Sequence, residues 1–431
     1  MDEGYPFYEQ GALVWDDEGT LIAAGKADEV KGEHDDVNWR DLGGRLVMPG
    51  LVCAHGHFYG FLARGISLKD EPPENFPQIL ERLWWRLDKA LDLETVEYSA
   101  LVGLIDCIKG GTTTFIDHHA SPYAVEGSLD AIAKAAQKVG MRVCTCYEVS
   151  DRDGAEITEA GIKENLRFIN AYPAGSHDKL SSAFGLHASF TVDTETLEKI
   201  AEQMPAGAGI HIHCCEALDD CTESEKKYGA RPVARLEKAG LLDGNALLAH
   251  GVYLNDEEIE LIADRGCKLI HNPMSNMNNA VGVAPVLKFI EKGIDVALGS
   301  DGYSSTMFDE YAVACILHKL DARDPRKAFV EPFDMLFKNN AALASPFFKK
   351  PVGSLAEGAY ADFLVMNYEP PTPMDETNLI GHLCFGLSRV RPDEVVIGGT
   401  TILKDGQFTS VDPKEVAVRA REATKGLWER F

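Results

Sequence analysis

Two histidines stand two residues apart where an apolar run ends. His55 and His57 close the segment LVMPGLVCAHGH. Side chains two residues apart on a β-strand point to the same side, so these imidazoles supply half of a metal site. Further along, His213 is followed three residues later by Glu216, a pair that can provide one ligand and one proton carrier. Residue types and spacing therefore fit a metal site beside a proton carrier, although a satisfied histidine in a turn and a helix cap fit the two motifs as well.

Two more polar residues follow apolar runs later in the chain. His250 ends LLAHG, and Asp301 lies in LGSDG. Taken singly, each motif also fits a structural role, such as a histidine bonded to backbone or an Asp that caps a helix. Their joint occurrence after four separate runs favours an active site.

The elements that must position these residues are βα units. From Leu46 to about Gly302, short apolar runs alternate with longer helical patterns, which is typical of a parallel sheet. Eight runs begin at Leu46, Thr112, Met141, Leu180, Ala208, Asn245, Cys267 and Asp295. We therefore predict an α/β fold, a (β/α)8 TIM barrel whose strands carry the site at their C-terminal ends.

The two flanks of the barrel predict further strands. Residues 11–45 contain a hairpin with an acidic turn, and residues 353–408 contain strands separated by Gly and Asp turns. Neither flank can close a core alone, so we predict one small β-sandwich built from both chain ends. The expected parts are residues 1–48 and 351–431 for the sandwich, with a terminal helix, and 49–350 for the barrel.

Composition excludes several classes of partner. The 431 residues include 42 Lys and Arg against 68 Asp and Glu, and the net charge of −26 repels nucleic acid and anionic membranes. No segment has the roughly 20 apolar residues that span a bilayer. The ten cysteines are dispersed, which is typical of reduced thiols. We expect a cytoplasmic protein that binds neither nucleic acid nor membrane.

The motifs together resemble a known family. PGLVCAHGH, HIHCCE, LLAHG and LGSDG are similar to the metal-binding pattern of the amidohydrolase superfamily, in its branch of cytosine, guanine and S-adenosylhomocysteine deaminases and chlorohydrolases. LGGRLVMPGLV and GSLAEGAYADFLV resemble the junctions between sandwich and barrel in that family. LWWRLDKALD, IDHHASP, HNPMSNMNNAVG and GHLCFG resemble the SsnA group of aminohydrolases, which implies a purine-like substrate.

The resemblance assigns roles to the matched residues. The implied ligands of one divalent metal ion are His55, His57, His213 and Asp301. His250 would hydrogen-bond the attacking water, Asp301 would help to deprotonate it, and Glu216 would carry protons to a ring nitrogen. The fourth strand end, GLHA, has no lysine of the kind that bridges two metals in relatives. We expect one ion per chain, zinc, with iron as the alternative.

The implied activity is hydrolysis of a non-peptide C–N bond, by an aminohydrolase that deaminates a purine-like or related nitrogen heterocycle. Ring opening of an oxopurine or cyclic ureide shares the first steps and stays an alternative. A catalytically inactive binding protein is disfavoured because all six motif residues are present. A metal-dependent esterase would favour a two-metal site. The expected partner is a small heterocyclic substrate, and the expected assembly is a homo-oligomer, a dimer or tetramer.

Several residues near the strand ends are candidates for substrate contact. They are His119, His187, Trp85, Phe58 and Asn272. Trp85 or Phe58 would stack on a flat ring, while the others would bind its polar edges. Consecutive strand residues face opposite sides, so at most one of His118 and His119 can point into the barrel mouth. Of the two, His119 is preferred. His211 is expected to lie deeper in the barrel.

Overall fold

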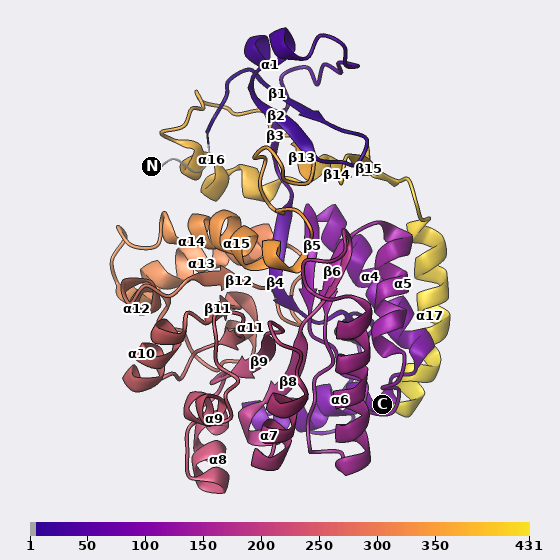
Figure 1. The fold of residues 1–431 in the computed structure, drawn as a ribbon, viewed down its shortest axis with the longest axis vertical. Coiled ribbons are helices and arrows are strands. Elements are labelled where there is room, and N and C mark those ends of the chain that lie inside the picture. The colour runs from indigo at the N-terminus through magenta and orange to yellow at the C-terminus, as the bar shows by residue number, and fades with distance from the viewer. Residues whose placement is uncertain (1–5) are drawn as a thin grey trace.

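The computed structural model describes residues 6–431, and its larger part is a closed barrel of parallel strands (Figure 1). The barrel strands are β4 (Leu51–Gly56), β5 (Thr112–Asp117), β6 (Arg142–Thr145), β7 (Leu180–Ser182), β8 (Phe184–Ala188), β9 (Ile210–Cys214), β10 (Leu247–His250), β11 (Lys268–His271) and β12 (Val296–Leu298). β7 pairs with β6 and β8 pairs with β9, so these two form the fourth barrel strand. A bridge between Gly56 and Asp301 closes the ring. The predicted (β/α)8 barrel is confirmed.

Helices surround the strands. They include α4 (Leu93–Lys109), α5 (Ser128–Val139), α6 (Ala155–Ala171), α7 (Thr194–Gln203), α8 (Leu218–Tyr228), α9 (Pro232–Lys238), α10 (Asp256–Arg265), α12 (Val286–Glu291) and α13 (Met307–Ala322). Asp92 and Thr95 form a capping box that starts α4. Gly140 and Gly266 end α5 and α10 with φ values of 96° and 68°, which glycine adopts without strain.

The barrel interior changes character along its axis. Toward the N-terminal ends of the strands it is filled by apolar side chains, among them Val52 and Leu247. Helix α15 (Asn340–Ala344) closes this end, since Asn340 Nδ2 donates to the carbonyl oxygens of Val52 at 2.6 Å and Leu298 at 2.9 Å. Toward the C-terminal ends, histidines replace the apolar residues.

The second part of the molecule combines both flanks of the barrel. A five-stranded sheet has the order β16-β15-β14-β13-β3, and the hairpin β1-β2 packs on it through Leu13. The strands are β1 (Gly11–Trp15), β2 (Leu21–Lys26), β3 (Leu46–Pro49), β13 (Phe363–Met366), β14 (Pro392–Ile397), β15 (Thr400–Lys404) and β16 (Gln407–Phe408). β3 pairs antiparallel with β13, so both flanks share one sheet, as predicted. The first apolar run therefore splits at Gly50 into a sandwich strand and a barrel strand.

Arg142 at the start of β6 connects the two parts. Its guanidinium donates to both carboxylate oxygens of Asp362, at 2.9 and 2.8 Å, and stacks 3.5 Å from the ring centroid of Tyr360. Helix α17 (Pro413–Arg430) leaves the sandwich and lies beside α4 on the outside of the barrel (Figure 1). There Trp428 Nε1 donates to the Leu62 carbonyl oxygen at 2.9 Å.

A segment between β4 and α4 runs over the C-terminal mouth of the barrel. It contains η1 (Phe58–Ala63), α2 (Phe76–Ile79), the π-helical turn η2 (Leu80–Trp84) and α3 (Trp85–Ala90). Four of its aromatic residues, Tyr59, Phe76, Trp84 and Trp85, line the pocket below. This segment therefore forms an aromatic cover for the barrel mouth.

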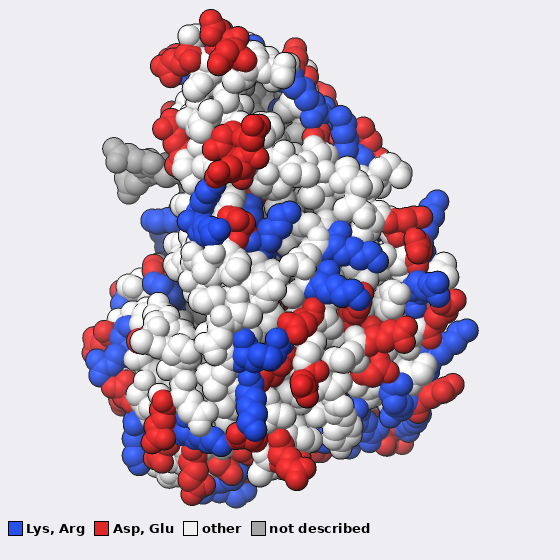
Figure 2. Space-filling model, turned by 45° about the vertical axis from the view of Figure 1, so that its right-hand side comes forward, with Lys and Arg blue, Asp and Glu red and all other residues white. Residues whose placement is uncertain are grey.

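The surface is mixed in charge. Figure 2 shows Asp and Glu interspersed with Lys and Arg on one face, with acidic side chains gathered at the tip of the sandwich that α1 (Ala27–Glu33) occupies. Within residues 6–431, no helix is both long and apolar enough to cross a bilayer.

Candidate active site

Three imidazoles converge at the C-terminal ends of β4 and β9, each held by its Nδ1 atom. His57 Nδ1 donates to the His118 carbonyl oxygen at 2.5 Å, and His213 Nδ1 donates to the His187 carbonyl oxygen at 3.0 Å. His55 Nδ1 lies 2.8 Å from His211 Nε2. For His57 and His213, the carbonyl partner fixes the Nδ1–H tautomer and leaves the Nε2 lone pair free for a cation.

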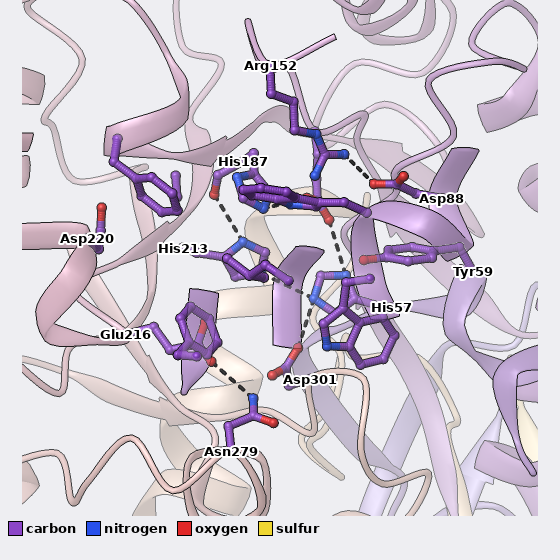
Figure 3. Close-up of a pocket in the computed structure, with 17 residues that line it drawn as sticks. His57, Tyr59, Asp88, Arg152, His187, His213, Glu216, Asp220, Asn279 and Asp301 are labelled. Atoms are coloured by element: carbon purple, nitrogen blue, oxygen red, sulfur yellow. Dashed lines mark hydrogen bonds and ion pairs between the residues drawn. The ribbon is translucent and has the colours of Figure 1, made fainter. Parts of the chain in front are cut away.

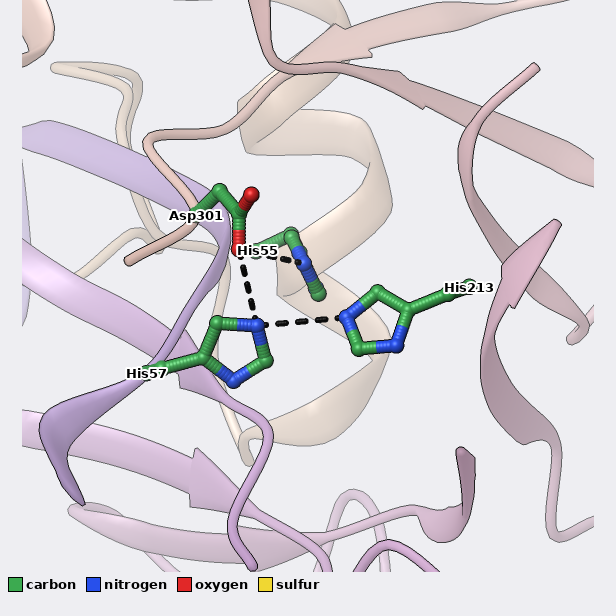
Figure 4. Close-up of side chains that lie close together, drawn as sticks. All are labelled: His55, His57, His213 and Asp301. Carbon is green, nitrogen blue, oxygen red and sulfur yellow. Dashed lines mark hydrogen bonds and ion pairs between the residues drawn. The ribbon is translucent and has the colours of Figure 1, made fainter. Parts of the chain in front are cut away.

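Asp301 completes the cluster just after β12 (Figure 4). Its Oδ1 atom lies 2.8 Å from His57 Nε2 and 3.7 Å from His55 Nε2, and His213 Nε2 lies 3.2 Å from His57 Nε2. The four ligand atoms lie within 4.8 Å of one another. Three imidazole nitrogens and one carboxylate oxygen are a donor set that suits a divalent ion such as zinc.

The electrostatics of the cluster favour positive charge at its centre. Burial lowers the pKa of His55 to about 3, which keeps this imidazole neutral, as a ligand must be. Burial also acts to lower the pKa of His57, but the hydrogen bond and charge of Asp301 outweigh it and raise this pKa to about 9. Buried His55 Nε2 has no hydrogen-bond partner among residues 6–431. The donors and the charge therefore fit a metal cation.

His250 and Glu216 lie beside this cluster. His250 Nε2 is 3.5 Å from Glu216 Oε2 and 3.9 Å from Asp301 Oδ2. Burial raises the pKa of Glu216 to about 7, so the carboxyl can both give and take a proton near neutral pH. The backbone of His250 and Asp301 has φ values of 80° and 53°, a strained conformation that clusters at functional sites.

One short helix contacts each of these proton-handling groups. In α11 (Pro273–Asn278), Ser275 Oγ donates to Asp301 Oδ2, and Asn276 Oδ1 lies 2.8 Å from His250 Nδ1. Asn279, the next residue after the helix, donates through Nδ2 to Glu216 Oε1 at 3.3 Å. A single element thus orients three side chains from three different strand ends.

A pocket opens above the cluster (Figure 3). Aromatic side chains form its cover, and five carboxylates line it: Asp88, Glu148, Glu216, Asp220 and Asp301. The guanidinium in its lining belongs to Arg152, which is paired with Asp88 and with Asp153. The pocket therefore favours a flat ligand that is neutral or donor-rich over an anionic one.

The residues expected to contact substrate divide into two groups. Trp85 and His187 line the pocket, with ring centroids 6.1 Å apart. Phe58, His119 and Asn272 do not line it. Contact of these three residues with substrate stays a prediction.

The position of each of these three side chains has a local cause. Phe58 begins the 3-10 turn η1, which carries its ring away from the mouth to stack on Phe115 with centroids 4.2 Å apart. His119 Nε2 lies 2.8 Å from Ser121 Oγ, while the neighbouring His118 faces the histidine cluster. Asn272 is fully buried beneath the site. His211, as expected, lies deeper and supports His55.

Five charged or amide residues of the pocket were not predicted from the sequence: Asp88, Glu148, Arg152, Asp220 and Asn279. Glu148 and Arg152 follow β6, where the run MRVCTCYEV was assigned only a structural role. A single glutamate in an otherwise apolar run was the available signal, because a carboxylate is rarely buried without a partner or a function.

Comparison with known proteins gives a consistent result. A sequence model described as the Amidohydrolase family matches residues 46–402. The 5'-deoxyadenosine deaminase of Methanocaldococcus jannaschii is 32% identical over 92% of this chain and 93% of its own, and that of Methanopyrus kandleri is 28% identical over 97% and 95%.

The fold has a solved counterpart as well. A crystal structure of an adenosine deaminase from Xanthomonas campestris with bound zinc superposes with a TM-score of 0.83 at 22% identity, covering 97% of this chain and 94% of that one. The matched motifs, the inserted barrel and the relatives of equal length lead to one conclusion: this chain belongs to the amidohydrolase family.

Proposed function

We propose that this protein is a metal-dependent aminohydrolase that removes an amino group from a purine-like heterocycle. The observation that carries the proposal is the convergence of Glu216, His250 and Asp301 on one side of the cluster formed by His55, His57 and His213. Hydrolysis of C–N bonds is the chemistry of the family, and the relatives named above are deaminases.

The proposed residue roles follow from these distances. One divalent ion, zinc by preference, would be held by His55, His57, His213 and Asp301, and it supplies Lewis acidity that lowers the pKa of a water molecule. His250 and Asp301 take the proton that the attacking water loses. Glu216 donates its proton to the ring nitrogen next to the attacked carbon, which makes that carbon electrophilic. The proton held by His250 then passes to the leaving amino group, which departs as ammonia, and the remaining hydroxyl proton returns to Glu216 as the carbonyl forms.

The pocket supports a heterocyclic substrate. The aromatic cover formed by Tyr59, Trp84 and Trp85 can stack on a flat ring. Simple esters offer neither flatness nor a ring nitrogen for Glu216, so we expect them to be very poor substrates. The ion count, the assignment to the SsnA group, the cytoplasmic location, the domain limits and the homo-oligomeric state stay predictions.

The test is a screen of purified protein against aminopurines, oxopurines, pyrimidines and cyclic ureides, reading ammonia and ring absorbance together. We expect ammonia release with about one divalent ion per chain, and loss of both ion and activity on chelation. Loss of ring absorbance without ammonia would identify ring opening instead. Two ions per chain, full activity without any, or ester hydrolysis that exceeds every heterocycle by a decade would contradict the proposal.

A further inference from the structure

Glu148 lines the pocket, and its carboxylate takes no part in the proposed mechanism. Its side chain is buried, and its backbone N–H donates to the His119 carbonyl oxygen at 2.7 Å. Glu148 Oε1 lies 3.3 Å from His118 Nδ1, and neither atom has a hydrogen-bond partner among residues 6–431. Oε1 also lies 3.3 Å from His57 Nδ1, so the carboxyl group sits between His118 and one of the clustered histidines.

The tautomer of His118 decides how this carboxyl presents itself. His118 Nε2 lies 3.0 Å from the His211 carbonyl oxygen, which can only accept, so Nε2 carries the hydrogen and Nδ1 is an acceptor. Any proton on the Glu148 carboxyl therefore sits on Oε1, facing that acceptor. Oε2 remains an acceptor directed at the pocket in either protonation state.

His187 offers a second acceptor beside it. Thr191 Oγ1 donates its only hydrogen to the Ala188 carbonyl oxygen at 3.0 Å. The contact of 2.8 Å between Thr191 Oγ1 and His187 Nδ1 is therefore one in which the imidazole donates. His187 Nε2 is then unprotonated, and it lies 4.0 Å from Glu148 Oε2. Both residues line the pocket, and within residues 6–431 no donor is hydrogen-bonded to either atom.

We propose that these two atoms, Glu148 Oε2 and His187 Nε2, form an acceptor wall that selects heterocycles with free ring N–H groups. A free purine base carries a ring N–H at the nitrogen that bears the sugar in a nucleoside, and this hydrogen can be donated to one of the two acceptors. An N-substituted ring leaves a buried acceptor unpaired, which a hydrogen-bonding site rejects strongly. The inference rests on the proposed function and narrows its substrate class to free bases.

The charge of the pocket supports the same class. Five carboxylates line it, while Arg152 is held by Asp88 and Asp153. A phosphorylated nucleotide would meet repulsion here. The related archaeal proteins are named for 5'-deoxyadenosine, a nucleoside, so the acceptor wall would distinguish this chain from them.

The experiment compares adenine with 9-methyladenine and guanine with 9-methylguanine on the full-length, metal-loaded protein. Binding is measured by quenching of tryptophan fluorescence, since Trp84 and Trp85 line the pocket, and turnover is measured by ammonia release. We expect at least one free base to bind about tenfold or more tightly than its methylated form.

Two substitutions at one position test the cause. Glu148→Met removes the acceptor and should reduce the binding ratio to about threefold or less. Glu148→Gln should keep it, because the amide nitrogen donates to His118 Nδ1 and its carbonyl oxygen takes the place of Oε2. Thr191 does not line the pocket, and Thr191→Val removes the partner that fixes the His187 tautomer. This variant should also lower the binding ratio. It tests the proposal even if Glu148→Met does not fold.

The outcomes separate the two proposals. Equal binding of base and methylated base by the unaltered protein, an unchanged ratio in both Glu148→Met and Thr191→Val, or metal loss in both Glu148 variants overturns the acceptor wall. Discrimination in binding with no ammonia from any compound leaves the acceptor wall intact and contradicts deamination instead.

Discussion

At the scale of single residues, Glu216 is the group whose chemistry separates catalysis from metal binding. It lies 3.5 Å from His250 Nε2 but is not one of the four clustered ligands. Glu216→Gln keeps the shape of the side chain and removes its ability to carry a proton. We expect kcat to fall by a factor on the order of 10² or more with the metal content unchanged. Elemental analysis beside steady-state kinetics checks this, and loss of the metal would make Glu216 a ligand.

The residues that could be predicted from the sequence are those at strand ends. His55, His57, His213, His250, Glu216 and Asp301 follow apolar runs, so their convergence needed only the barrel. Which of His118 and His119 faces the histidine cluster depends on how β5 twists where it ends, and the structure turns His118 toward the cluster although His119 was preferred. The stacking of Phe58 on Phe115 could not be predicted, because a 3-10 turn follows His57 directly.

At the scale of elements, α11 and the residue after it hold His250, Asp301 and Glu216 in place through hydrogen bonds. Asn276→Leu removes the acceptor that holds His250 Nδ1, at 2.8 Å in the present structure. We expect kcat to fall by about tenfold or more while KM changes little, since Asn276 does not line the pocket. Asn278→Leu, an exposed position on the same helix, is the control. Equal losses in both variants would show that the helix as a whole was disturbed.

The packing of α13 on β11 includes a buried histidine pair. His318 Nε2 lies 3.0 Å from His271 Nε2, and burial lowers the pKa of His318 to about 4 although Asp321 and Glu331 act to raise it. The unfolded chain binds this proton below about pH 6.5, while the folded chain does not bind it until about pH 4. The free energy of unfolding is therefore unaffected by this group above pH 6.5, and it decreases as pH falls from about 6.5 to about 4.

This histidine predicts a pH-dependent stability. For one such group the free energy of unfolding falls by up to about 1.4 kcal/mol per pH unit across that window. His318→Gln should flatten the decline of the unfolding midpoint between pH 6.5 and pH 4. Melting curves of both proteins at pH 7.5, 6 and 5 check this. Parallel declines would mean that other groups titrate instead.

The ends of helices can be predicted from the sequence where capping residues mark them. Asp92 with Thr95 starts α4, and Gly140 ends α5, as their residue types predict. The internal structure of the cover over residues 58–90 could not be predicted, because its short 3-10, α and π turns have no periodicity of their own and depend on aromatic packing against the barrel mouth.

At the scale of the whole molecule, Arg142 joins the barrel to the sandwich. Both Arg142 and Asp362 are fully buried. Arg142→Met leaves an unpaired buried carboxylate, and breaking such a pair costs about 3 to 5 kcal/mol. We expect a marked drop in melting temperature, partly restored in the double variant Arg142→Met/Asp362→Leu. An unchanged melting temperature in the single variant would show that the contact contributes little.

The sheet shared by β3 and β13 also sets the order in which the protein can fold during synthesis. β3 leaves the ribosome more than 300 residues before its partner β13 exists. At 5 to 20 residues per second this interval lasts from about 15 seconds to about a minute. For that time the nascent chain exposes an unpaired strand edge, which is a template for aggregation.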